Sequence, residues 1–233
     1  MWQSLIDLFF PPYCLDCSQV LVTSEQWLCT GCWVALPQTD YHLTDNNSLA
    51  QKFHGRFPIA HVMAFGTYSD GNAIQKLVHQ LKYYNKPRIG ETLGRHYGLI
   101  LRDMEWSKHL DLIIPVPLHK SKLRKRGYNQ NDGFAKGLSI ALSIPWETGA
   151  LSRTRKTKPQ VSKGRRARLA NIEGAFEVTD SQKVQNKHIL LVDDVITTGA
   201  TMEACALPLL AAGAKAISLA AIGTGHQSYS EFY

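Results

Sequence analysis

The chain has 233 residues, of which 44% are hydrophobic, and a formal net charge of +7. This length is enough for one sizeable α/β core with a small appendage, and it excludes two full domains. The positive charge favours anionic partners, either polyphosphorylated substrates or nucleic acid, and it does not choose between them.

The first ten residues are mostly apolar and end at Pro11 and Pro12. They carry Asp7, lack the basic start of a signal peptide, and are too few to span a membrane. A short helix packed on the core explains them better than an anchor on a membrane surface. Because the sequence has no long apolar run elsewhere, we expect a soluble, cytoplasmic protein.

Four cysteines form two Cys-x-x-Cys pairs separated by eleven residues: Cys14 with Cys17, and Cys29 with Cys32. Two such pairs can bring four thiolates into a tetrahedron around zinc. Disulfides are a weaker alternative, because thiols stay reduced in the cytoplasm. A redox-active pair would leave the second pair unexplained. The spacing therefore predicts a structural zinc site with four cysteine ligands.

Composition divides the chain into three parts. The N-terminal helix and zinc ribbon are expected within residues 1–36, a linker rich in polar residues over 37–58, and the main domain over 59–233. In the main domain, apolar patterning predicts alternating strands and helices. Strands are expected at residues 59–68, 111–117, 149–152, 189–192 and 214–222, and helices at 73–81, 89–104, 129–143 and 201–212.

This alternation predicts the α/β class, with a doubly wound, mostly parallel sheet preceded by the small zinc ribbon. One residue departs from the pattern. Pro208 lies inside the last expected helix, where proline removes a hydrogen bond and requires a kink to be accommodated.

The functional prediction depends on residues 188–201. The apolar run 189–192 is typical of a strand buried on both faces, and Asp193 and Asp194 follow at its carboxyl end, where open α/β sheets bind ligands. Carboxylates accept hydrogen bonds from the hydroxyls of a ribose.

The residues that follow offer three hydroxyls, one glycine and the backbone N–H groups of a helix start, which suit the 5-phosphate of such a ribose. They are Thr197, Thr198, Gly199, Ala200 and Thr201. The alternative is an ordinary strand-to-helix turn in which aspartate and threonine act as caps.

A basic segment at residues 118–130 follows the expected strand 111–117. Its Lys120, Arg124 and Arg126 are candidates for holding a second, more highly charged anion such as pyrophosphate. The alternative is a solvated basic loop. Two interpretations also stay open for Lys82, at the end of an expected helix: contact with an anion, or simple solvation.

A second basic segment covers residues 153–168 and has eight Lys or Arg and no acidic residue. Gly164 and Pro159 leave it mobile. Arg155 and Arg168 are its candidates for closing over the anion.

The order of apolar run, two acids, two apolar residues and Thr-Thr-Gly-Ala-Thr resembles the signature with which type I phosphoribosyltransferases bind phosphoribosyl pyrophosphate (PRPP). Further matches make the chain similar to the ComF family of competence-associated, phosphoribosyltransferase-like proteins. They are the Pro-Pro-x-Cys start, Pro-Val-Pro followed by Arg-Gly-Tyr-Asn-Gln, and the residues Arg155, Thr157, Gln160, Arg168 and Asn171. The resemblance implies a zinc ribbon, a pyrophosphate loop at 118–130, and a catalytic loop from 153 that folds over PRPP.

Two functions are expected from different classes. In the first, the protein binds Mg-PRPP and transfers phosphoribosyl to an unknown acceptor, with Asp193, Asp194, Arg155 and Arg168 as catalytic residues and Mg²⁺ bridging ribose and pyrophosphate oxygens. In the second, which the family name implies, a non-catalytic DNA-uptake protein binds single-stranded DNA and partner proteins through its basic strip and zinc ribbon. A regulator that senses PRPP without turnover is a third hypothesis.

Overall fold

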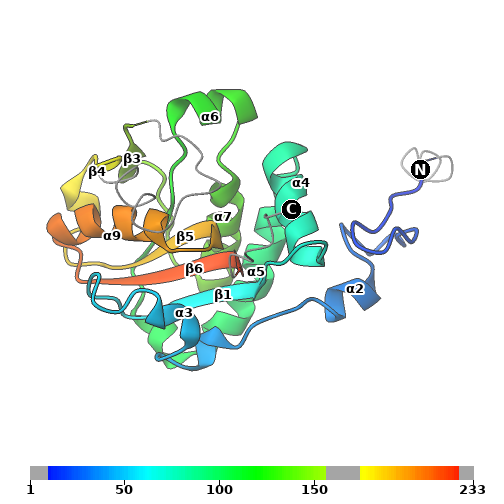
Figure 1. Cartoon of the computed structure of the whole chain (residues 1–233), viewed down its shortest axis with the longest axis horizontal. Coiled ribbons are helices and arrows are strands. Elements are labelled where there is room, and N and C mark those ends of the chain that lie inside the picture. Colours follow the sequence, from blue (N-terminus) through cyan, green and yellow to red (C-terminus); the bar gives the residue numbers. More distant parts are fainter. Residues whose placement is uncertain (1–9, 156–173, 226–233) are drawn as a thin grey trace, which may run out of the picture.

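The computed structural model describes residues 10–155 and 174–225 (Figure 1). Its centre is a parallel sheet of four strands in the order β1-β6-β5-β2. The strands are β1 (Val62–Thr67), β6 (Ala216–Thr224), β5 (His188–Ile196) and β2 (Leu112–Pro115). The predicted α/β class with a mostly parallel sheet is confirmed.

Helices cover both faces of the sheet. One face packs against α4 (Ala73–Tyr83), α5 (Arg88–Arg102) and α7 (Gln130–Leu142), and the other against α3 (Ser48–Gln51) and α9 (Ala200–Ala211). The run 189–192 alternates between these two cores, and all four of its side chains are 0% exposed. A strand buried on both faces needs such an unbroken apolar run.

Helices α5 and α7 touch backbone to backbone. A Cβ built on Gly94 would lie 2.3 Å from the carbonyl oxygen of Phe134, and one on Gly137 would lie 2.3 Å from that of Glu91. No side chain larger than hydrogen fits at either position. The glycines therefore lock α7, whose first residues reach the site, against α5.

The two acids lie inside β5 rather than after it. Strand β2 pairs with β5 only as far as Val192, because Pro115 and Pro117 end its ladder. On the other side, β6 continues to pair with β5 as far as Ile196. Beyond Val192 one edge of β5 is therefore left for side chains of another element.

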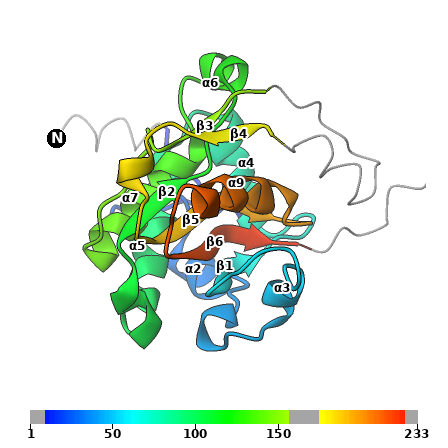
Figure 2. The ribbon, with the colours of Figure 1, turned by 90° about the vertical axis from the view of Figure 1, so that its left-hand side faces the viewer.

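One further expectation needs correction. The basic segment 118–130, expected as a loop, contains helix α6 (Lys120–Arg126), capped by His119 and ended by Gly127 at a φ of 82°. Lysine, arginine and leucine favour helix, and the left-handed glycine stops it. Pro208 lies within α9 and does not end it. Figure 2 shows α6 standing clear of the sheet on the side where β3 (Leu151–Arg153) and β4 (Phe176–Val178) lie. These two strands pair antiparallel in a separate sheet.

The second half of the segment 37–58, which was expected as a linker, packs on the main domain. Leu49 and Phe53 are 1% and 0% exposed and belong to the core on the α9 side. A 3-10 helix (Tyr41–Leu43) precedes α3 in the same segment. Two further 3-10 helices occur in the described chain, Glu105–His109 and Ser181–Lys183. Polar composition concealed the two apolar side chains that attach this segment to the main domain.

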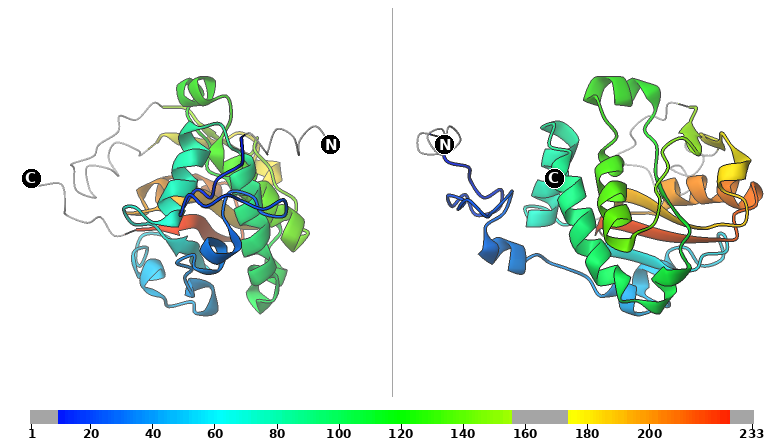
Figure 3. Two further views of the ribbon diagram at one scale, coloured as in Figure 1. Left: turned by 90° about the vertical axis from the view of Figure 1, so that its right-hand side faces the viewer. Right: turned by 180° about the vertical axis from the view of Figure 1, so that it is seen from behind.

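The cysteine-containing segment packs beside α4 and α5 through its short helix α2 (Thr30–Val34), as Figure 3 shows. Trp33 meets the ring of His96 edge-on at 5.1 Å, and Lys76 forms an ion pair with Asp16 at 2.7 Å. Its buried Cys14 and Leu28 join the core on that side. The segment is therefore attached to the main domain by both apolar and charged contacts.

Candidate functional site

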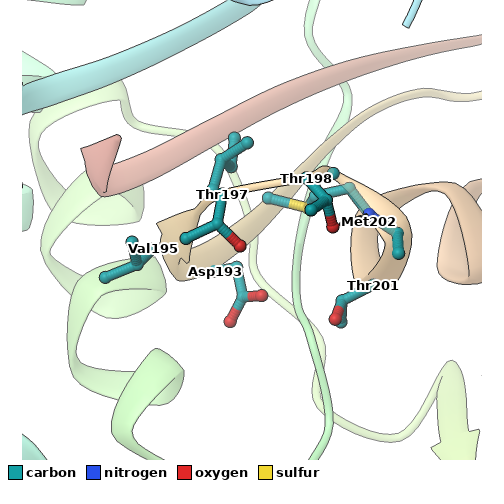
Figure 4. Close-up of a pocket in the computed structure, with 9 residues that line it drawn as sticks. Asp193, Val195, Thr197, Thr198, Thr201 and Met202 are labelled. Carbon is teal, nitrogen blue, oxygen red and sulfur yellow. Dashed lines mark hydrogen bonds between the residues drawn. The ribbon is translucent and has the colours of Figure 1, made fainter. Parts of the chain in front are cut away.

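The loop after β5 surrounds an open hollow of about 220 Å³. The hollow is lined by residues 195–202 together with Asp193, and in Figure 4 Asp193, Thr197 and Thr201 lie around a common space. Gly199 takes a φ of 78° and starts helix α9. A glycine in this conformation before a helix N-terminus leaves backbone N–H groups available to an anion. The five residues predicted to hold a phosphate thus line one hollow.

The segment predicted as a linker supports this loop from behind. Lys52 donates from Nζ to the carbonyl oxygen of Thr197 at 3.3 Å, and Arg56 donates to that of Thr198 at 3.0 Å. Arg56 also pairs with Glu203 at 3.2 Å, with 5% of its side chain exposed. The loop's carbonyl groups are therefore held by the enclosed side chain of Arg56 and the partly buried Lys52.

The ring of Phe53 fills the space beneath Gly199. A Cβ at this glycine would lie 2.5 Å from Cζ of Phe53, closer than non-bonded carbon atoms approach. The residue thus meets two requirements at once, a positive φ and the absence of a side chain. Sequence reasoning missed Phe53, Lys52 and Arg56, because their contacts with the loop span more than 140 residues.

The carboxylate pair is held by side chains from α7. Asn131 donates to Oδ1 of Asp193 at 2.9 Å, and Gln130 donates to Oδ2 of Asp194 at 2.6 Å. Asn131 also donates to the carbonyl oxygen of Val116 at 2.9 Å, just beyond the end of β2. Helix α7 therefore supplies the amides that occupy the edge of β5 where β2 has stopped.

A lysine completes the surroundings of Asp194. Lys82 places Nζ 2.8 Å from Oδ1 of this carboxylate, so the lysine is not simply solvated, and its contact with a bound anion stays a prediction. Burial alone would lower the pKa of Lys82, but the charges of Asp194 and Asp193 outweigh burial and raise it. The ammonium stays protonated at neutral pH. For Asp193, burial and the neighbouring charge of Asp194 raise the pKa.

Two more cations approach the acids. Lys122, an exposed residue on α6, has its pKa lowered by partial desolvation and by the charges of Arg153, Arg126 and Lys82. Arg153, at the end of β3, lies with its guanidinium 5.1 Å from the ring of Phe176, and its charge is felt by Asp193. Neither was singled out as a site residue from the sequence, where both are part of long basic runs.

The structure distinguishes the three basic residues predicted on 118–130. Lys120 and Arg124 are exposed, whereas Arg126 is partly buried. Arg126 donates to the side-chain oxygen of Gln130 and lies 5.7 Å from the ring of Tyr83. Arg126 is thus next to a residue that holds Asp194, and the other two stay predictions.

The two candidates on the second basic segment are placed differently. Arg155 is exposed and is the last described residue before residue 174. Arg168 lies outside the described residues, as do Thr157, Gln160 and Asn171. Their assignment to a loop that folds over PRPP stays a prediction.

The four cysteines meet as their spacing predicts. All four Sγ atoms lie within 4.8 Å of one another, and those of Cys17 and Cys29 are 3.7 Å apart. Tetrahedral zinc–thiolate bonds of about 2.3 Å place two sulfur atoms about 3.8 Å apart. The backbone N–H of Cys29 donates to Cys14 Sγ at 3.3 Å and that of Cys32 donates to Cys29 Sγ at 3.5 Å. The cluster can therefore hold a metal ion.

Among residues 10–155 and 174–225, no helix combines the length and apolar character needed to cross a membrane.

Comparison with known proteins adds one family model and several relatives. A model described as a phosphoribosyl transferase domain matches residues 133–232, which include most of α7 and all of β5, the phosphate loop and β6. The chain is 32% identical over 212 residues to the DNA utilization protein YhgH of Escherichia coli (strain K12), a match that covers 88% of this chain and 87% of that protein.

Two proteins with competence names are also similar. Competence protein F of Haemophilus influenzae is 30% identical over 205 residues, covering 83% of this chain and 89% of that protein. Competence protein ComFC of Bacillus subtilis is 28% identical over 150 residues, covering 64% and 58%. The matches to YhgH and to competence protein F span most of both chains.

Proposed function

The chain belongs to the ComF family of phosphoribosyltransferase-like proteins, and from that premise we propose that it binds Mg-PRPP and transfers the phosphoribosyl group to an acceptor. One observation carries the proposal: the threonine loop and Asp193 border the same open hollow at the carboxyl end of β5. A phosphate on the loop would bring its ribose hydroxyls to the carboxylates.

The proposed reaction breaks the bond between C1 of the ribose and the pyrophosphate oxygen, and an acceptor atom forms the new bond to C1. Positive charge develops on the sugar and negative charge on the departing pyrophosphate, so both ends need stabilisation. Asp193 and Asp194 suit the sugar. Arg126, Lys122 and Arg153 suit the pyrophosphate. Mg²⁺ bound to PRPP would supply a Lewis acid.

The test is calorimetric titration of the protein with Mg-PRPP at fixed salt. We expect micromolar binding, lost in the double variant Asp193→Asn with Asp194→Asn, followed by pyrophosphate release in an acceptor screen. Binding without release by any acceptor would favour the PRPP-sensing regulator. No binding by the folded protein would overturn the proposal.

We propose zinc as the ion of the cysteine cluster, with a structural role, because four sulfur ligands leave no coordination position for a substrate. The measurement is metal content by mass spectrometry of the purified protein, with one zinc per chain expected. Cys29→Ser should lower both the zinc content and the melting temperature. Cys205→Ser, which changes a buried cysteine on α9, should leave the zinc content unchanged. A metal-free protein with unaltered melting would contradict the assignment.

A second candidate function is binding of single-stranded DNA, and the names of the relatives YhgH and competence protein F favour it. All 26 Lys and Arg lie within residues 52–233, whereas residues 1–51 have five acidic residues and no basic one. Phosphate contacts depend on positive charge. We therefore assign nucleic-acid contact to the main domain alone, whereas the sequence-based alternative assigned it to the basic strip and the zinc ribbon together.

Fluorescence anisotropy with a labelled oligonucleotide at several salt concentrations tests this second function. We expect affinity to fall steeply with salt, and replacement of the Lys and Arg of residues 153–168 by glutamine to reduce both the affinity and the salt dependence. Salt-insensitive binding would exclude the assignment.

A further inference from the structure

Lys82 forms an ion pair with Asp194, one of the two carboxylates that the proposed function assigns to the ribose. Its Nζ lies 2.8 Å from Oδ1 of Asp194, and Gln130 donates to Oδ2 at 2.6 Å, so both oxygens are engaged. The side chains of Lys82 and Asp194 are only 23% and 10% exposed, which shields their ion pair from water. A ribose hydroxyl must therefore share or displace one of two donors.

The two donors differ in their ability to move. Gln130 opens helix α7, which the contacts at Gly94 and Gly137 lock against α5. Lys82 lies in the last turn of α4 and reaches Asp194 at the end of a flexible four-carbon stem. Its neighbours Tyr83 and Tyr84 are 66% and 58% exposed, so the end of this helix is not enclosed. Lys82 is the donor that can leave.

A second destination for Lys82 lies close by. Its charge is felt by Lys122, which also feels Arg126 and Arg153. The charges of Asp193 or Asp194 act on Lys82, Lys122 and Arg153, so among the described residues several cations share two carboxylates. An excess of positive charge at a partly buried site is stabilised by an anion with several charges.

We propose that Lys82 exchanges one counter-ion for another: it pairs with Asp194 while the site is empty, and moves to the pyrophosphate oxygens of PRPP when ribose takes over the carboxylate. The identity of the ligand rests on the proposed function, but the exchange is a property of this lysine and this carboxylate. Without ribose, Asp194 and pyrophosphate compete for the same ammonium group.

Competition predicts an unusual gain in affinity. Asp194→Asn removes the charge that holds Lys82, so the variant should bind pyrophosphate alone about fivefold more tightly than the wild type, as expected for release of one partly exposed ion pair. Asp193→Asn removes an equal charge one residue away without releasing Lys82, and it should give a much smaller gain. In the double variant Lys82→Met with Asp194→Asn, the gain should disappear.

The experiment is calorimetric titration of these proteins with pyrophosphate, after their melting temperatures have shown that they are folded. Equal gains in the two aspartate variants would reveal a general charge effect and overturn the exchange, and so would no gain in Asp194→Asn. Titration of the wild type with Mg-PRPP separates the two proposals. Absence of PRPP binding would overturn the proposed function, whereas the exchange of Lys82 is tested by the pyrophosphate titrations alone.

A second variant covers the case in which Asp194→Asn does not fold. Lys82→Met should weaken Mg-PRPP binding about tenfold to a hundredfold, the effect of losing one charged hydrogen bond, and leave binding of ribose 5-phosphate nearly unchanged. Lys108→Met is the control, because it removes a surface ion pair with Glu105 before β2, at the opposite end of the sheet. Equal losses of affinity for Mg-PRPP and for ribose 5-phosphate would mean that Lys82 has only a structural role.

Discussion

The two halves of the candidate site are prepared in opposite ways. The phosphate loop is supported from behind by Phe53, Lys52 and Arg56, and its ligand side borders an open hollow. The carboxylates Asp193 and Asp194 are engaged on their ligand side by amides and an ammonium group. One half is ready for an anion, whereas in the other half both oxygens of Asp194 already have partners.

This difference teaches how binding should proceed. A phosphate can bind to the loop without rearrangement, because the groups that hold the loop contact its carbonyl oxygens. A ribose that binds Asp194 must share or replace the partners that this carboxylate already has. We therefore expect the phosphate end of PRPP to contribute most of the initial affinity, and the sugar end to determine what moves.

The largest effect is expected from Phe53→Ala, which removes the support of the open half. Truncating a phenylalanine that is 0% exposed should lower the free energy of unfolding by about 3–5 kcal/mol, and the unsupported loop should lose PRPP. Phe57→Ala is the matched control, since its ring contacts Phe53 at 5.9 Å. It should also destabilise the fold, yet retain PRPP binding. Denaturant unfolding and PRPP titration measure both; equal loss of affinity in the two variants would contradict a specific support.

The next effect concerns Gly199→Ala. The new Cβ would meet Phe53 at 2.5 Å, and the φ of 78° adds strain of about 1–3 kcal/mol. We expect PRPP affinity to fall more than the free energy of unfolding would suggest, because the loop itself must shift. Gly71→Ala is the control, since Gly71 has a φ of 77° and nothing within 4 Å of its added Cβ. Similar unfolding curves for the two variants would mean that the contact with Phe53 is unimportant.

A smaller effect, with the opposite sign for stability, is expected from Asp193→Asn in the occupied half. Burial raises the pKa of Asp193, so between pH 4 and that raised pKa the folded protein binds more protons than the unfolded chain. The free energy of unfolding of the wild type therefore falls as the pH rises through this window. The asparagine variant lacks this contribution, because its side chain does not ionise. Melting temperatures at pH 5 and pH 8 should show an advantage of the variant that grows with pH, together with weaker PRPP binding.

The control for this pH dependence is Asp103→Asn, which changes a carboxylate whose side chain is 77% exposed. It should show the same difference from the wild type at both pH values. If Asp193→Asn showed the same pH-independent difference, ionisation of Asp193 would not destabilise the folded protein.

The smallest effect is expected from Lys52→Met, which removes one donor behind the loop. Its hydrogen bond to Thr197 is long, at 3.3 Å, and burial lowers the pKa of the lysine, which makes the charge costly to keep. We expect PRPP affinity to fall about threefold with little change in melting temperature. A larger loss of PRPP affinity than in Gly199→Ala would mean that Lys52 supports the loop more strongly than the contact between Phe53 and Gly199 does.

Sequence and structure agree best where the information is local. The run 189–192, the two acids and the threonine loop are contiguous, so apolar pattern and residue chemistry were enough to predict a strand followed by an anion site. The cysteine cluster was predictable for the same reason. Helix α6 was missed because charge was given more weight than helix propensity.

The partners of the site were not predictable in this way. Lys82 and Asp194 are separated by more than 100 residues, and Phe53 and Gly199 by more than 140, so only the folded chain brings them together. The polar composition around Phe53 pointed to a linker. Gln130 was named as part of a motif and Asn131 was not, and the role of both depends on where β2 ends.

The glycine contact between α5 and α7 limits which motions the protein can use. Packed helices slide past one another when interlocking side chains can change their conformation, and at Gly94 and Gly137 there are no side chains to do so. We therefore expect that α7 does not slide along α5 in this fold. Conformational adjustment on ligand binding is therefore expected from individual side chains and from the loops around them, on the nanosecond to microsecond timescale of these motions and not on the millisecond timescale of helix movement.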